Sequence, residues 1–249
     1  MIDRIATLFR RRKAAAEFKV RFDRSASFRL PDTIWLNNRM RKLSLPDESG
    51  IKVAFIDLLL DDCYGCHLLK NCDGKINTVL DIGGNVGLFG IAARTAFPGA
   101  TIHSYEPNKR LESYLAVQAE AAGFDYFMEA VGHNDGMISL DLNEESVHTR
   151  SKLGSDGTTT QIAFAKAIER MGGMVDFLKM DCEGAEWEIF KDEESWKKVN
   201  NLSMEYHLFE PVHTVQAVRQ AIENFGFTIS SFIHIDNFGL VRASRLSKQ

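Results

Sequence analysis

The stretch that decides the fold is Thr78–Gly87, which reads TVLDIGGNVG. An apolar run ends here in Asp81 and passes into a glycine-rich turn, which an apolar segment of helical character follows. A second apolar run, Ile102–Tyr105, ends in Glu106, 25 positions after Asp81. Acids at the ends of two adjacent strands are typical of nucleoside binding at the carboxyl edge of an open α/β sheet. We therefore expect such a sheet with a ligand site at this edge.

Apolar segments of strand and helix type alternate along the rest of the chain. Strands are predicted near 78–82, 101–106, 125–131, 175–181 and 201–207, and helices near 86–97, 108–122, 162–171, 185–191 and 213–225. This rhythm predicts a mostly parallel seven-stranded sheet with right-handed crossovers. The segment 138–142 reads as an extra strand. The runs 227–234 and 240–245, joined by a tight Asn/Gly turn, predict an antiparallel hairpin at one sheet edge.

The first 49 residues read as a small extension ahead of a main domain over 50–249. A basic helix opens it, and an alternating pattern over 18–36, broken at Pro31-Asp32, predicts a β-hairpin. Residues 50–71 have a helical pattern. The polar segment 143–160 is expected to be a mobile lid or substrate loop.

Composition limits the classes of function. The chain has 249 residues, is 45% hydrophobic and carries a net charge of −4, which suits a soluble globular protein and not a nucleic-acid binder. Charge is uneven, because residues 1–30 hold nine Lys/Arg against three acids. We interpret residues 1–13 as a solvated docking helix, with weak contact to a membrane surface as the alternative. Without an apolar signal or spanning segment, we expect a cytoplasmic protein.

A cysteine cluster lies in the segment Cys63–Cys72. Cys63 and Cys66 form a C-x-x-C pattern, His67 follows, and Cys72 is near. A zinc knuckle would need a fourth ligand at matching spacing, and haem attachment would need export. We favour free thiols in a reducing compartment.

The glycine turn distinguishes between nucleoside ligands. A dinucleotide fingerprint needs glycines at three fixed offsets so that a pyrophosphate can approach the backbone, and no offset here satisfies it. A turn that opens with a carboxylate suits a ligand with cationic groups, such as S-adenosylmethionine. Asp81 and the turn residues are expected to contact its methionine part, namely Gly83, Gly84, Asn85 and Gly87. The simpler alternative is that Asp81 caps the helix and the glycines only form the turn.

The nucleoside half of the ligand is assigned to the next two strand ends. Glu106 is expected to accept both ribose hydroxyls, with Asn108 following it at the ribose edge. The third strand ends near Glu129 and Ala130, so we expect the Ala130 backbone, with Glu129 beside it, to contact adenine.

Several segments together resemble the FkbM family of S-adenosylmethionine-dependent methyltransferases. They are residues 80–87, 105–108, 129–132, 177–186 (FLKMDCEGAE) and 204–207. The resemblance covers about residues 75–245 and implies a class I methyltransferase (Rossmann-like) fold and, most often, O-methylation of sugar or polyketide hydroxyls. The chain departs from the family at Gly84, where alanine is common, and residues 1–74 match only loosely.

The catalytic candidates lie at the ends of two later strands. Asp181 ends one strand, while Glu205 and His207 share a side of the next, so we expect the three to converge. An aliphatic hydroxyl is a poor nucleophile and needs a positioned base. We assign that role to His207 or Glu205, and Asp181 to orienting the acceptor or holding the methionine ammonium. The same residues suit a divalent metal, but we favour a metal-free site. Taken singly, Glu205 is equally interpretable as an ion-pair partner of Lys179.

The sequence thus predicts an S-adenosylmethionine-dependent O-methyltransferase acting on a small-molecule or glycan acceptor. Two other classes stay open. One is a nicotinamide-dependent oxidoreductase, against which the missing dinucleotide fingerprint argues. The other is a catalytically silent methyltransferase fold that serves as a scaffold through its basic N-terminal helix.

Overall fold

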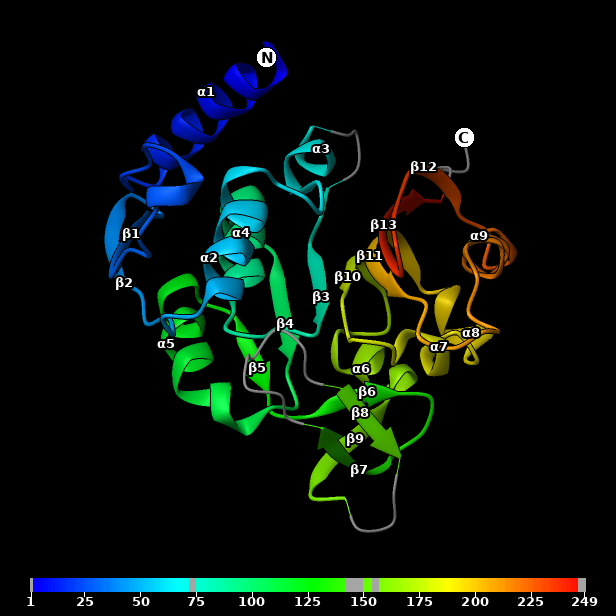
Figure 1. The fold of residues 1–249 in the computed structure, drawn as a ribbon. Helices are drawn as coiled ribbons and strands as arrows, with labels where there is room; N and C mark the ends of the chain where they lie inside the picture. The colour runs from blue at the N-terminus through cyan, green and yellow to red at the C-terminus, as the bar shows by residue number, and fades with distance from the viewer. Residues whose placement is uncertain (1, 72–74, 142–149, 154–156, 246–249) are drawn as a thin grey trace.

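A seven-stranded sheet forms the centre of the protein (Figure 1). A computed structural model describes residues 2–71, 75–141, 150–153 and 157–245. The strands of this sheet are β3 (Thr78–Ile82), β4 (Thr101–Tyr105), β5 (Asp125–Phe127), β10 (Val175–Met180), β11 (Val199–His207), β12 (Thr228–Ile235) and β13 (Phe238–Ser244). Their order is β12-β13-β11-β10-β3-β4-β5. Only β13 runs against the others, because β11 and β12 both pair with it antiparallel. The predicted sheet and its C-terminal hairpin are confirmed.

Helices cover both faces of this sheet (Figure 1). The helices of the described residues are α1 (Ile2–Glu17), α2 (Ser49–Phe55), α3 (Cys66–Lys70), α4 (Leu88–Ala96), α5 (Glu112–Ala122), α6 (Phe164–Arg170), α7 (Glu186–Ile189), α8 (Glu193–Trp196) and α9 (Val215–Asn224), of which α1 lies outside the layer next to the sheet. Neighbouring strand residues point into different cores: Val79 packs on the α4 side, and Leu80 packs on the α6 side. Burial on both faces explains why these strands read as continuous apolar runs.

The N-terminal hairpin is displaced from its predicted place. Its strands are β1 (Thr33–Leu36) and β2 (Arg39–Lys42), so the strand pairing predicted over 18–36 is wrong. Asn37 and Asn38 both have positive φ, as a two-residue hairpin turn requires, and asparagine tolerates this conformation. The apolar residues before it serve the core instead: Phe18, Phe22 and Phe28 belong to the same buried cluster as α4.

The helical pattern over 50–71 divides into α2, a π-helical turn η2 (Ile56–Leu60) and α3. Positive φ at Asp62 and Gly65 interrupts it. Cys63 and Cys66 carry free thiols, and burial raises the pKa of both. Cys72 lies outside the described residues. The predicted boundary between an N-terminal extension (1–49) and the main domain (50–249) stays a prediction.

The strand predicted over 125–131 is two strands in two sheets. β5 closes the main sheet, whereas β6 (Ala130–Gly132) joins a second sheet of order β6-β9-β7-β8. Its other strands are β7 (Gly136–Asp141), β8 (Arg150–Leu153) and β9 (Thr159–Ala163). β7 contains most of the extra strand predicted near 138–142. Part of the predicted lid is therefore β-structure, and residues 142–149 and 154–156 lie outside the described residues.

Among the helices of the described residues, none is both long enough and apolar enough to span a membrane.

Candidate active site

A cavity of about 510 Å³ opens at the carboxyl ends of the central strands. Chain connections leave in opposite directions on the two sides of β3, which is where open α/β sheets bind their ligands. The glycine turn after β3 forms its floor, Glu106 after β4 lies on one side, and Asp181 after β10 on the other. Residues of α2 and η2, among them Val53 and Leu58, also line the cavity.

The glycine turn packs tightly between the strand ends. The N–H groups of Gly83 and Gly84 both donate to the Tyr105 carbonyl at 2.9 Å. Gly83 has a φ of +82°, and a Cβ there would lie 1.6 Å from the Asp181 carbonyl oxygen. A Cβ on Gly84 would lie 2.1 Å from Ser104 Oγ. Gly83 therefore requires glycine, whereas a side chain at Gly84 would require Ser104 to move.

Asp81 lies behind this turn and does not line the cavity. It is fully buried; Ser104 Oγ donates to its Oδ2 at 2.7 Å, and Lys179 Nζ lies 3.2 Å from its Oδ1. Lys179 also donates to the Gly83 carbonyl at 2.6 Å. Lys179 thus pairs with Asp81 and not with Glu205. Asp81 supports the turn through Lys179, so its proposed part in ligand binding is indirect.

Glu106 presents a buried carboxylate to the cavity. Its Oε2 accepts the Asn85 N–H at 2.8 Å and its Oε1 accepts the Asn108 N–H at 2.7 Å. Burial raises the pKa of Glu106 to about 7, against the effect of these two hydrogen bonds. Each oxygen retains a lone pair for a ligand hydroxyl. The Asn108 side chain accepts the Arg110 N–H, and Asn108 does not line the cavity.

Glu129 and Ala130, assigned to adenine, both line the cavity beside Val131. The Glu129 carboxylate forms an ion pair with Arg170 of α6. The Arg170 guanidinium lies 5.0 Å from the centre of the Phe127 ring. The Glu129 carboxylate is therefore already paired with Arg170, while the backbone N–H and carbonyl of Ala130 are the groups assigned to adenine.

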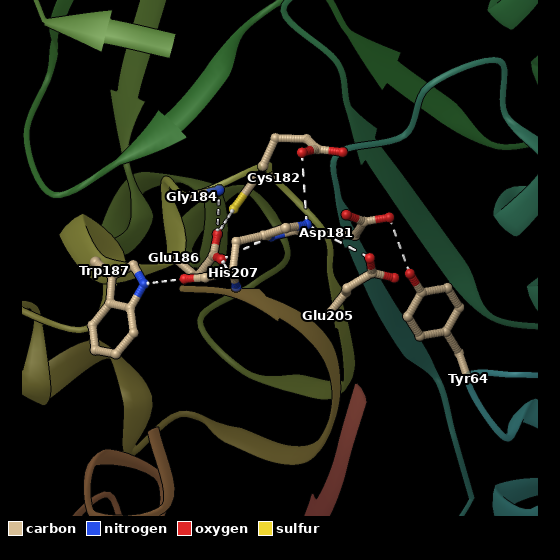
Figure 2. Close-up of polar contacts among 9 residues, drawn as sticks. Tyr64, Asp181, Cys182, Gly184, Glu186, Trp187, Glu205 and His207 are labelled. Atoms are coloured by element: carbon tan, nitrogen blue, oxygen red, sulfur yellow. Dashed lines mark hydrogen bonds and ion pairs between the residues drawn. The ribbon is translucent and has the colours of Figure 1, made fainter. Parts of the chain in front are cut away.

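The three catalytic candidates meet at the other end of the cavity (Figure 2). Strands β10 and β11 pair with Met180 opposite Met204, so Asp181 and Glu205 follow side by side. Ligand atoms of Asp181, Glu205 and His207 lie within 4.8 Å of one another. Asp181 and Glu205 line the cavity, and His207 lies just behind them. The predicted convergence is present.

Glu186 holds the His207 ring. Its Oε1 lies 3.0 Å from Nδ1 of His207 and accepts the His207 N–H at 2.7 Å, while its Oε2 accepts the Gly184 N–H at 2.9 Å. Nε2 of His207 then faces Glu183 Oε2 and Glu205 Oε1, each at 3.6 Å. Figure 2 shows His207 between Glu186 and Glu205.

The crowded acids perturb one another. Burial and neighbouring carboxylates raise the pKa of Glu183 to about 7, and burial and Asp181 also raise the pKa of Glu205. Burial lowers the pKa of His207, but Glu186 and Glu205 outweigh it and raise this pKa to about 11. These carboxylates therefore favour the protonated form of His207, and its assignment as general base stays a prediction.

Two residues of the site were missed from the sequence. Tyr64 donates its hydroxyl to Asp181 Oδ2 at 3.1 Å, although it comes from the C-x-x-C segment far away in the chain. Glu186 reads as an ordinary first-turn acid of a helix, yet it is fully buried against His207. The Glu-Gly-x-Glu spacing of residues 183–186 places Glu186 about one turn beyond the strand end. This spacing is the sequence feature from which its place in the site could have been predicted.

The sheet order, with its single reversed strand and its cavity at the switch point, defines a class I methyltransferase fold. The family model for the methyltransferase FkbM domain matches residues 81–229. The chain therefore belongs to the FkbM family and is a methyltransferase.

Similar proteins span most of the chain. It is 26% identical over 235 residues to Methyltransferase sdnD of Sordaria araneosa, covering 76% of this chain and 87% of that protein. It is 23% identical over 235 residues to Methyltransferase 1 of Beauveria bassiana (strain ARSEF 2860), covering 77% and 90%. Among solved structures, magnesium protoporphyrin IX methyltransferase (ChlM) from Synechocystis PCC 6803 aligns with a TM-score of 0.48 at 12% identity, over 82% of this chain and 87% of that one.

Proposed function

We propose that the cavity binds S-adenosylmethionine and that the protein transfers the methyl group to a hydroxyl of a sugar, glycan or secondary metabolite. The observation that carries the proposal is the acidic lining of a cavity whose floor is a glycine turn. Six carboxylates and one lysine are the charged groups among its described lining residues: Asp57, Glu106, Glu129, Asp181, Glu183, Glu205 and Lys179.

This charge distribution favours a cationic ligand over a phosphate-bearing one. Lys179 is the single cation of the described lining, and it is already bound to Asp81 and the Gly83 carbonyl. A pyrophosphate would therefore meet an excess of acids over cations on the described cavity wall, and like charges repel strongly where water is excluded. The sulfonium and ammonium groups of S-adenosylmethionine would be attracted by the same acids. This argues against a nicotinamide dinucleotide.

The remaining parts of the cofactor also match the lining. The Glu106 carboxylate retains two lone pairs with which to accept the two ribose hydroxyls. Ile82, Val131 and the Ala130 backbone supply the apolar and polar surfaces that an adenine ring needs. The Gly83–Gly84 turn leaves no side chain between the backbone and the methionine part.

Asp181, Glu183 and Glu205, called here the acid cluster, are proposed to bind the acceptor hydroxyl. When bound, the cofactor supplies an electrophilic methyl group on sulfur. The acceptor oxygen forms the new bond to the methyl carbon as the carbon–sulfur bond breaks, and sulfur keeps that electron pair. The hydroxyl proton must leave as well, because an aliphatic alcohol is barely ionised at neutral pH. Asp181 and Glu205 line the cavity and are placed to hold the hydroxyl and take its proton.

The acceptor is proposed to enter beneath α2. Val53 and Leu58 line the cavity from α2 and η2. Val53 is 56% exposed, so this wall is open to solvent. An acceptor with an apolar face and a hydroxyl suits such an entrance.

Ligand binding followed by methyl transfer tests the proposal. Thermal shift with S-adenosylmethionine, S-adenosylhomocysteine and NAD should show stabilisation by the first two alone. Transfer of labelled methyl from the cofactor to a panel of sugar and metabolite hydroxyls should then be lost in Glu205→Gln, while the exposed Glu112→Gln variant transfers normally. Stabilisation by NAD alone would replace the proposal with the oxidoreductase. Cofactor binding without transfer to any acceptor would replace it with the silent scaffold.

A further inference from the structure

The residues behind the acid cluster have the arrangement of a metal-binding histidine. In such sites the second ring nitrogen of the histidine donates to a carboxylate, which fixes the ring and directs the free nitrogen to the ion. Here Glu186 Oε1 lies 3.0 Å from His207 Nδ1 and also accepts the His207 N–H. Glu186 is itself fully buried and anchored by the Gly184 N–H. The orientation of His207 Nε2 is therefore set by the fold.

Nε2 of His207 faces two carboxylate oxygens, with which it forms long ion pairs. Glu205 Oε1 and Glu183 Oε2 each lie 3.6 Å from it, beyond ordinary hydrogen-bond length. Ligand atoms of Asp181, Glu205 and His207 lie within 4.8 Å of one another. Two ligands of one ion, each bound at about 2.1 Å, lie up to about 4.2 Å apart. Small side-chain movements would therefore close this set around a single ion.

The excess of negative charge around His207 favours the binding of a cation. Four carboxylates surround one imidazole: Asp181, Glu183, Glu186 and Glu205. Lys179, the nearest described cation on the cavity wall, is committed to Asp81. Tyr64 contributes only a neutral hydroxyl to Asp181.

We infer that Asp181, Glu205 and His207 form a binding site for one divalent first-row metal ion such as Mn²⁺. Two carboxylates and one imidazole suit such an ion, and the open side of the set faces the cavity. Its use rests on the proposed function: the ion would bind the acceptor hydroxyl and make it easier to deprotonate. The sequence favoured a metal-free site because two acids and one histidine near a strand end are also common without a metal, and it does not show that Glu186 contacts His207.

Manganese binding by the full chain tests this inference without any assay of activity. Chelator-treated protein is titrated with MnCl2, and free Mn²⁺ is followed by electron paramagnetic resonance. We expect saturation at one Mn²⁺ per chain, with binding weakened at least about tenfold in Glu205→Gln and in Asp181→Asn. Glu186→Gln should weaken binding as well, because it removes the support of His207. The matched control is Glu188→Gln on α7, whose carboxylate pairs with Lys191 outside the cluster.

Circular dichroism of each variant ensures that a loss reflects the site and not unfolding. Glu205→Gln is the primary variant, because that side chain is 30% exposed and its replacement leaves the core intact. The inference is overturned if no saturable Mn²⁺ binding occurs, or if folded Glu205→Gln and Asp181→Asn bind as tightly as the parent. S-adenosylhomocysteine binding by the chelator-treated protein separates the two proposals. If this ligand binds while Mn²⁺ does not, the metal site is overturned and the proposed cofactor site stands.

Discussion

Lys179 Nζ lies 3.2 Å from Asp81 Oδ1, and the two residues face each other in register on neighbouring strands β10 and β3. Both side chains are buried, and the lysine extends the pair to the Gly83 carbonyl. The buried ion pair therefore joins the strand that ends in the acid cluster to the turn proposed to hold the cofactor.

Removing one partner of this pair should be costly. Lys179→Met leaves the Asp81 charge buried and is expected to lower the free energy of unfolding by about 3–5 kcal/mol. The double variant Lys179→Met/Asp81→Asn should recover part of this loss, because no isolated charge remains. Urea unfolding of the parent, single and double variants measures it. The exposed Lys197→Met variant, at an i,i+3 pair with Glu194, should change little. Additive costs in the double variant would show that the residues do not interact.

The second prediction concerns Gly84, where the family often has alanine. A Cβ at this position would lie 2.1 Å from Ser104 Oγ, the group that donates to Asp81. Gly84→Ala should therefore destabilise the protein by about 1–3 kcal/mol through overpacking. Ser104→Ala removes the clashing oxygen but also a hydrogen bond to a buried carboxylate. The two substitutions together should cost clearly less than the sum of the single ones in urea unfolding. If the double variant costs as much as the two single variants together, the alanine at position 84 does not press on Ser104.

Cofactor affinity should depend on pH through Glu106. Its pKa is raised to about 7 by burial, so the carboxylate is ionised above this pH and protonated below it. Only the ionised form accepts from both ribose hydroxyls, so affinity for S-adenosylhomocysteine should fall as pH drops, with a limit of about tenfold per pH unit below 7. Calorimetry between pH 6 and pH 8.5 measures the slope. Glu106→Gln should bind weakly with a flatter profile, and an unchanged slope in this variant would assign the titration to another group.

Much of the fold could be predicted from the sequence because its strands are buried on both faces. Such strands appear as apolar runs whatever their partners are, and the runs ending in Asp81, Glu106 and Asp181 were located within a residue or two. The N-terminal hairpin was misplaced because the alternation over 18–36 outweighed the Asn37-Asn38 pair. That pair marks the turn, since both residues adopt positive φ.

The candidate site was predictable only in part, for a geometric reason. Residues that follow parallel strands meet at one edge, which brought Asp181, Glu205 and His207 together correctly. Cross-strand register is not readable from one sequence, so the pairing of Lys179 with Asp81 was not foreseen. Tyr64 reaches Asp181 from the turn between η2 and α3, and no local sequence pattern predicts such a contact.

Calorimetric titration of S-adenosylhomocysteine into the parent, Glu106→Ala and Glu112→Ala proteins tests the central claim most directly. Glu106 lies on the cavity wall with both oxygens held by backbone N–H groups, whereas Glu112 is an exposed acid at the start of α5. The account predicts one binding site per chain, with Kd raised at least about tenfold by Glu106→Ala, the equivalent of 1.4 kcal/mol or more, and unchanged by Glu112→Ala. No binding by the parent, or equal binding by the parent and Glu106→Ala, would contradict it.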